Sequence, residues 1–469
     1  MKVRGKSTQH SAAQTTNSPE HRGATLWKRM AIGSSSPADT PPLLTPTAGL
    51  SSALAVLDLG MIGSDPGRRA VPSAGANYPY ECYVVARNEA GTAGLYRVDS
   101  GRRICQLARS GTEVTDALCE TGLTVPDDGA IIVVSTRPWL SMRKYGDRGY
   151  LYTQVDAAHL AVNLALAAGC LGGSSALRPR PSGLNRLIEA YGACSEVHSA
   201  VSITTTAGRA EPSGWVVRDG RAGEEGGPAS RQPHWLERAC WESLGVDEDP
   251  PQDAGRSATA PPPLAGRDAL TAAEPRVSDT TLRERRSATG FVPGAISAQA
   301  LYAMLESAGA MLDVVLAERT DLAMTLLVRN VPEFDPGRSC PAGIRALEAT
   351  KLSRQDVECA FMSQAHLADS SAILLFHAPT ALLNRGDDSS DLRSVLFRAG
   401  AFGQLMYLSA TEHRLAITGV GGFDSSRWKR LADLPDDHDV VYTVALGVEA
   451  PAAPKLDKLQ AAYAQNEAS

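Results

Sequence analysis

Two adjacent ionisable residues, Lys144 and Tyr145, form the pair in this chain that is best suited to proton transfer. A neighbouring ammonium favours the tyrosinate form. Tyr145 could therefore accept a proton with Lys144 as its electrostatic partner, or the two roles could be reversed. The alternative is an ordinary solvated loop, because the pair lies within the charged segment 143–148. We interpret Lys144 and Tyr145 as candidate catalytic residues.

A turn rich in small residues, Pro-Ser-Ala-Gly-Ala-Asn-Tyr-Pro at 72–79, precedes the apolar segment 82–86. Such a composition brings backbone amides close to whatever the turn faces, and it leaves room for a flat ligand. The amides of Ser73, Ala74 and Gly75 are therefore candidate ligand-binding groups. The alternative is a turn that does no more than lead into a strand.

Anion-binding residues lie far from this turn in the sequence. Arg285 and Arg286 can make charge-assisted, partly bidentate hydrogen bonds to a phosphate, and Ser287 adds a hydroxyl donor. Gly421 and Gly422 would allow another close backbone approach to a ligand. The two arginines could instead begin an exposed basic helix.

Composition limits the classes of function. The net charge of −6 gives no indication of nucleic-acid binding. The eight cysteines include no C-x-x-C pair, so we expect free thiols and no metal site. The first 25 residues contain no apolar segment of a signal peptide, and no apolar stretch is long enough to cross a membrane. These features predict a cytoplasmic protein that contacts neither nucleic acid nor membrane.

An internal repeat runs through the chain. The apolar segments 83–88 and 325–330 lie 242 positions apart, and so do 130–134 and 372–376. The closing apolar segments begin at Ser199 and His438, which are 239 positions apart. Apolar strands that alternate with Ala- and Leu-rich helices predict an α+β fold, with a unit of helices and sheet present twice.

The two copies carry different special residues. The turn at 72–79 aligns with 314–321, a segment without Gly or Pro, whereas Arg285-Arg286-Ser287 aligns with Leu43-Leu44-Thr45. Each copy thus has one set of candidate residues and lacks the other. If the copies pack as a pseudo-dimer, a single composite site can form from both.

Composition also suggests boundaries for these units. We predict a disordered arm at 1–45, a first domain at 46–208, a linker at 209–277, a second domain at 278–450 and a tail at 451–469. Within the linker, 234–244 could form a short helix that docks on a domain.

The segment from Pro72 to Glu81 and the segment from Lys144 to Tyr150 resemble those of SagB-type dehydrogenases. Residues 285–291 and 421–424 resemble the wider nitroreductase superfamily. The resemblance implies two tandem nitroreductase-like α/β sandwich domains. It also implies that FMN is held by Ser73, Ala74, Gly75, Arg285, Arg286, Ser287, Gly421 and Gly422. The chain departs from the superfamily at Thr289, where a basic residue is common.

The resemblance further implies oxidation of thiazoline and oxazoline rings to thiazoles and oxazoles in ribosomally made peptides, beside a cyclodehydratase. Lys144 and Tyr145 would then be the catalytic pair, and the azoline-containing precursor peptide would be the substrate. Two alternatives remain: a nitroreductase-like enzyme that uses NAD(P)H on small molecules, and a flavin-free scaffold that binds a peptide or partner. A further dimer of chains is compatible with each.

Overall fold

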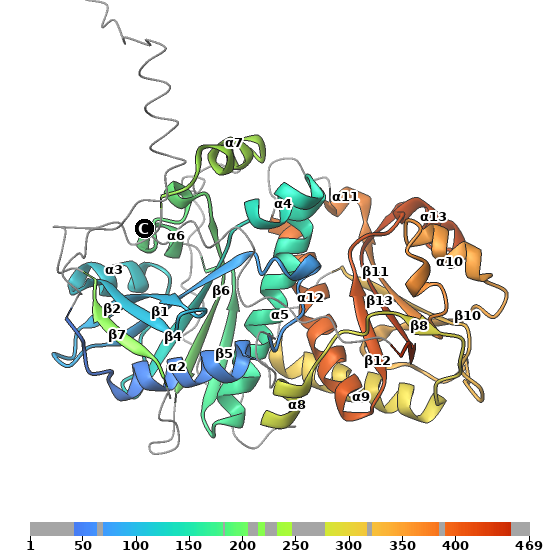
Figure 1. Ribbon diagram of the computed structural model, residues 1–469, viewed down its shortest axis with the longest axis horizontal. Coiled ribbons are helices and arrows are strands. Elements are labelled where there is room, and N and C mark those ends of the chain that lie inside the picture. The colour runs from blue at the N-terminus through green and yellow to red at the C-terminus, as the bar shows by residue number, and fades with distance from the viewer. Residues whose placement is uncertain are drawn as a thin grey trace, which may run out of the picture. The chain divides into compact units, whose positions relative to one another are not determined.

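Strands in the middle of the first half are apolar at successive positions, and successive side chains point to opposite faces, so both faces are packed. The computed structural model describes residues 42–62, 69–181, 183–204, 214–220, 232–245, 277–316, 321–383 and 390–451. Within them, the first sheet has the strand order β5-β6-β4-β1-β2-β3-β7 (Figure 1). Its strands are β1 (Tyr80–Arg87), β2 (Ala93–Asp99), β3 (Ile104–Ser110), β4 (Gly129–Thr136), β5 (Ser174–Pro179), β6 (Glu196–Thr204) and β7 (Val216–Asp219).

Helices cover both faces of this sheet. Val84 and Ile132 pack in the core that contains residues of α2 and α5, whereas Tyr83 and Ile131 pack in the core that contains residues of α3 and α6. The helices of the first half and of the segment after it are α2 (Ala48–Met61), α3 (Thr112–Glu120), α4 (Trp139–Tyr145), α5 (Arg148–Cys170), α6 (Leu184–Leu187) and α7 (Trp235–Ser243).

The second sheet has the order β10-β9-β11-β13-β12, and the short strand β8 pairs with β13. Its strands are β8 (Phe291–Val292), β9 (Ala323–Val328), β10 (Arg345–Glu348), β11 (Ala372–Pro379), β12 (Ala416–Val420) and β13 (His438–Glu449). The helices of this half are α8 (Asp279–Glu284), α9 (Ala298–Val315), α10 (Arg354–Ala360), α11 (Thr380–Leu383), α12 (Ser390–Glu412) and α13 (Ser425–Leu431). The expected α+β class is confirmed.

Four antiparallel strands recur in the same order in both sheets, β5-β6-β4-β1 and β12-β13-β11-β9. Tyr83 pairs with Val133, and Thr325 pairs with Leu375, so both partners are shifted by 242 positions. A bulge follows Val134 in β4 and Phe376 in β11, again 242 apart.

The closing strands require a correction. Val201 pairs with Ile132, and Val444 pairs with Leu374, which gives a spacing of 243 rather than the expected 239. Apolar composition alone left the register of these strands open, because only the pairing with the neighbouring strand fixes it.

The halves meet through α5 and α12, which lie side by side between the two sheets (Figure 1). A Cβ atom on Gly400 would lie 2.7 Å from the Cβ atom of Ala158, so glycine permits the close helix contact there. Gln404 Nε2 donates to Asn163 Oδ1 at 2.7 Å in the buried interface. One apolar core therefore joins residues of both halves.

The segment predicted as a linker supplies two described elements. β7 pairs with β3 in parallel, and the described residue Leu44 donates its N–H to the carbonyl of Val217 at 2.9 Å. The expected helix forms as α7, and its Trp241 is buried. The described residues leave out 209–213, 221–231 and 246–276 of the predicted linker, 1–41 of the predicted arm and 452–469 of the predicted tail. The domain boundaries themselves stay predictions.

Candidate functional site

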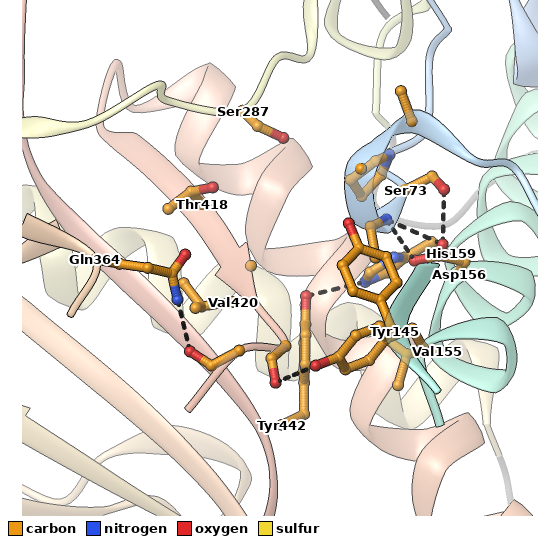
Figure 2. A pocket seen from close by; sticks show the side chains of 18 of the residues that line it. Ser73, Tyr145, Val155, Asp156, His159, Ser287, Gln364, Thr418, Val420 and Tyr442 are labelled. Carbon is orange, nitrogen blue, oxygen red and sulfur yellow. Dashed lines mark hydrogen bonds between the residues drawn. The ribbon is translucent and has the colours of Figure 1, made fainter. Parts of the chain in front are cut away.

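Most of the residues singled out in the sequence line one cavity of about 880 Å³. One wall comes from 72–76, the end of α4 and the first turns of α5; the other comes from 286–289, 362–367 and 418–422. Figure 2 shows Ser73, Asp156 and Tyr145 on one side, and Ser287, Thr418 and Gln364 on the other. Residues from the two halves therefore share the cavity, as a composite site requires.

Asp156 of α5 holds the small-residue turn in place (Figure 2). Ser73 Oγ donates to Asp156 Oδ2 at 2.7 Å, and the Ala74 N–H donates to the same oxygen at 3.0 Å. The Tyr78 N–H in turn donates to Ser73 Oγ at 2.8 Å. The Ala74 amide, predicted to face a ligand, is thus bonded to Asp156. Sequence analysis missed Asp156, although a carboxylate inside an apolar helix was a usable signal.

Lys144 and Tyr145 converge on Gly75. Helix α4 ends at Tyr145, and Gly146 leaves the helix with a φ of 60°. The Lys144 ammonium lies 5.0 Å from the centre of the Tyr145 ring, and that ring packs edge-on against Tyr152 with 5.1 Å between centres. A side chain on Gly75 would overlap the hydroxyl of Tyr145 and the ammonium of Lys144. The structure thus brings together three of the predicted site residues.

Replacing Gly75 with alanine should disturb this pair more than the fold. Gly75 has a φ of 62°, where an L-residue is strained, and the added methyl group would displace both side chains. We expect the G75A variant to fold, because the turn is partly exposed, and to lose turnover in the assay described below. Turnover by G75A at the wild-type rate would show that the position of the pair is unimportant. Alanine at Gly91, which also has positive φ but no neighbour within 4 Å, is the matched control.

Arg285 and Arg286 have different surroundings. Arg285 is fully buried and does not line the cavity. Its Nε donates to the carbonyl of Ala70 at 2.7 Å and its Nη2 to that of Arg69 at 3.1 Å, which ties the two halves together. Its Nη1 donates to Ser287 Oγ at 3.3 Å.

Arg286 does line the cavity, with 46% of its side chain exposed, and it forms an ion pair with Glu449. The expectation that both arginines face a phosphate in the same way therefore needs revision. Arg286 lines the cavity, whereas its Nη1 and Nη2 both donate to Glu449, which is outside the cavity lining.

Ser287 and Thr289 complete this wall. The Ser287 hydroxyl lies 3.1 Å from the hydroxyl of Tyr407, and Thr289 Oγ1 is buried without a hydrogen-bond partner among the described residues. A buried hydroxyl without a partner in a cavity wall suits a polar ligand atom. With Arg286, these groups form a donor set that fits an anionic or carbonyl-bearing ligand.

Gly421 and Gly422 line the cavity and support side chains of its wall. The carbonyl of Gly421 accepts from the Tyr152 hydroxyl at 2.7 Å, and that of Gly422 accepts from Gln364 Nε2 at 2.7 Å. A Cβ atom on Gly421 would overlap the Tyr152 ring. Glycine at 421 therefore lets α5 of the first half approach the second half.

His159 of α5 is a buried histidine of the site. It lies in the cavity wall, and its Nδ1 has no hydrogen-bond partner among the residues that the structure describes. Burial, followed by the charge of Arg285, lowers the pKa of His159 to about 3, so its ring is neutral near pH 7. Burial also raises the pKa of Tyr442 well above its usual value, and the Tyr442 hydroxyl lies 3.5 Å from His159 Nε2. Sequence analysis missed Tyr442, which carries no local motif.

The described residues contain no cluster of three metal-ligating side chains, and none of their helices is long and apolar enough to cross a membrane. The cavity volume lies within the range of about 300–1,000 Å³ that is usual for small-molecule sites. Its lining combines hydroxyl and guanidinium groups with small residues and aromatic rings, which suits a ligand that has both polar groups and a planar part.

Comparison with known proteins shows a family likeness in the second half. The model of the Nitroreductase family matches residues 273–448, so this part of the chain is similar to that family. A nitroreductase-like protein of Methanocaldococcus jannaschii is 30% identical over 116 residues. That match covers 24% of this chain, and the chain spans 58% of the length of that relative.

A solved structure extends the likeness in fold to both halves. The structure of a nitroreductase-like protein from Anabaena variabilis superposes on this chain with a TM-score of 0.62 and 17% sequence identity. The match covers 88% of this chain and 93% of that protein. At this identity the likeness concerns the fold. The chain therefore has a mixed α+β, nitroreductase-like fold.

Proposed function

We propose that this protein is an FMN-dependent oxidoreductase that oxidises thiazoline or oxazoline rings of a ribosomally made peptide to thiazoles or oxazoles. The observation that carries the proposal is the convergence of Lys144 and Tyr145 on Gly75, inside a cavity shared by both halves. A base at that position suits a reaction that removes a proton from a ring carbon.

The residues around the cavity fit FMN. Arg286, Ser287 and Thr289 would hold its polar and anionic groups, and Arg285 would support this wall from behind. The turn at 73–75 and the glycines at 421–422 would border its planar part. FMN, when bound, would supply the acceptor for the hydride that leaves the azoline ring.

Oxidation of an azoline to an azole removes one hydride and one proton. Tyr145 would take the proton from the ring carbon through its phenolic oxygen, with the Lys144 ammonium as the neighbouring cation. Tyr152 is a weaker candidate, because burial raises the pKa of its hydroxyl. In addition, the Tyr152 hydroxyl already donates to the carbonyl of Gly421.

The repeated strand order supports the further proposal that the chain is a pseudo-dimer of two nitroreductase-like domains. In such an arrangement the first half contributes the turn and the Lys-Tyr pair to the flavin site, and the second half contributes residues 286–289. One flavin per chain is then expected, with the precursor peptide as substrate and a cyclodehydratase as partner.

An anaerobic experiment tests the reaction. The purified protein is mixed separately with NADPH and with an azoline-containing peptide, and the visible absorbance of the flavin is followed. We expect the peptide to bleach the flavin and to lose the mass of two hydrogen atoms, whereas NADPH alone should leave the flavin oxidised. Bleaching by NADPH alone would favour a nitroreductase-like enzyme of small molecules. A colourless protein that FMN does not restore would favour a peptide-binding scaffold.

A further inference from the structure

Helix α7 belongs to the segment whose composition predicts a linker, yet it packs closely against the first half. Trp241 is 9% exposed, and its ring lies 6.1 Å from that of Tyr191. Cys240 Sγ lies 3.6 Å from Met142 Sδ, and Met142 belongs to α4, the helix that ends in the Lys-Tyr pair. A passive linker has no need of such contacts.

A buried ion pair holds α7 to the start of α4. Arg137 Nε donates to Glu237 Oε1 at 2.8 Å, and Arg137 Nη2 donates to Glu237 Oε2 at 3.0 Å. The side chain of Arg137 is 4% exposed and that of Glu237 is 0% exposed. Because burial of both charges is costly, such a pair is weak evidence for stability, but its bidentate geometry fixes orientation.

Arg137 makes backbone hydrogen bonds to two of the segments that lead to the cavity wall. It lies between β4 and α4, and its carbonyl accepts the N–H of Leu140 in α4 at 3.2 Å. Its own N–H donates to the carbonyl of Pro79 at 2.9 Å, at the end of the small-residue turn. The orientation of Arg137 thus bears on both the turn and the Lys-Tyr helix.

We propose that α7 helps to position the residues of the site. In this proposal Glu237 is a positioning residue that acts through Arg137 on α4 and on the turn at 72–79. The role in turnover rests on the proposed function, whereas the mechanical coupling does not. The matched variants are E237Q, which removes the charge, and E242Q, which changes an exposed glutamate on the same helix.

Amide hydrogen exchange measures the effect of Glu237 on α4 and on the turn at 72–79, and it requires no substrate. We expect E237Q to speed amide exchange in 139–145 and 72–79 by about tenfold or more, the factor that loss of a charge-assisted hydrogen bond gives in an opening equilibrium. E242Q should exchange like the wild type. Faster exchange confined to α7 would overturn the proposal. If E237Q does not fold, E237D keeps the charge but shortens the side chain, and it is held to the same criterion.

Turnover supplies the second measurement. With the azoline peptide, E237Q should lower kcat by about tenfold or more, with KM and flavin content near wild type, because a displacement of about 1 Å can cost about 10²-fold. A normal kcat together with wild-type exchange would also overturn the inference. If the wild-type protein does not oxidise azolines, the proposed function fails, and the exchange result still decides the role of α7.

Discussion

Replacement of Tyr145 with phenylalanine should leave the protein yellow and should lower azoline oxidation by about 10²–10⁴-fold, the usual contribution of a general base. The substitution removes only the hydroxyl, so the ring contact with Tyr152 is kept. Flavin content measured by absorbance and single-turnover rates with the azoline peptide provide the test. Lys144→Ala should also lower the rate of azoline oxidation, because Tyr145 would lose its neighbouring ammonium.

Tyr152→Phe is the matched control for this prediction. It removes a hydroxyl from the same cavity, but one that donates to the carbonyl of Gly421 and whose pKa is raised by burial. We expect a much smaller loss of rate in Y152F than in Y145F. Normal turnover by Y145F would show that another group takes the proton.

The second large effect is expected at Arg285. Replacement with alanine removes a fully buried guanidinium that donates to the carbonyls of Ala70 and Arg69. Loss of these charge-assisted hydrogen bonds should lower the free energy of unfolding by about 3 kcal/mol, because the buried carbonyls lose their donors. Flavin content should also fall, because Ser287 loses a neighbour that fixes its hydroxyl.

The adjacent Arg286→Ala variant separates stability from ligand binding. Its ion pair with Glu449 is partly exposed, so its loss should change the free energy of unfolding by no more than about 1 kcal/mol. Flavin affinity should fall, because Arg286 lines the cavity. Denaturant unfolding and flavin titration of both variants provide the measurement. Equal unfolding free energies for the two variants would contradict the assigned roles.

These contrasts show where inference from sequence ends. The repeat, the α+β class and the segments that line the cavity could be recognised in the sequence, because strand periodicity and turn composition are local properties. The burial of Arg285 and the exposure of the adjacent Arg286 could not be predicted from the sequence. They depend on which side of the chain meets the segment at 69–70 and which meets the cavity.

The same limit applies to residues without a motif. Asp156, Tyr152 and Tyr442 contribute to the cavity through contacts with residues far away in the sequence. His159 also carries no local motif, and its buried Nδ1 has no hydrogen-bond partner among the described residues. The composition of 209–277 likewise gave no sign that Glu237 would be buried against Arg137.

The sequence by itself determined which residue types are available and in which turns, strands and helices they lie. The tertiary structure decided which of them meet, since a hydrogen bond or an ion pair depends on distance and direction in space. The turn at 72–79, the end of α4 and the segment 286–289 share a cavity because α5 and α12 pack closely between the two sheets. That contact joins residues more than 200 positions apart, and no local pattern encodes it.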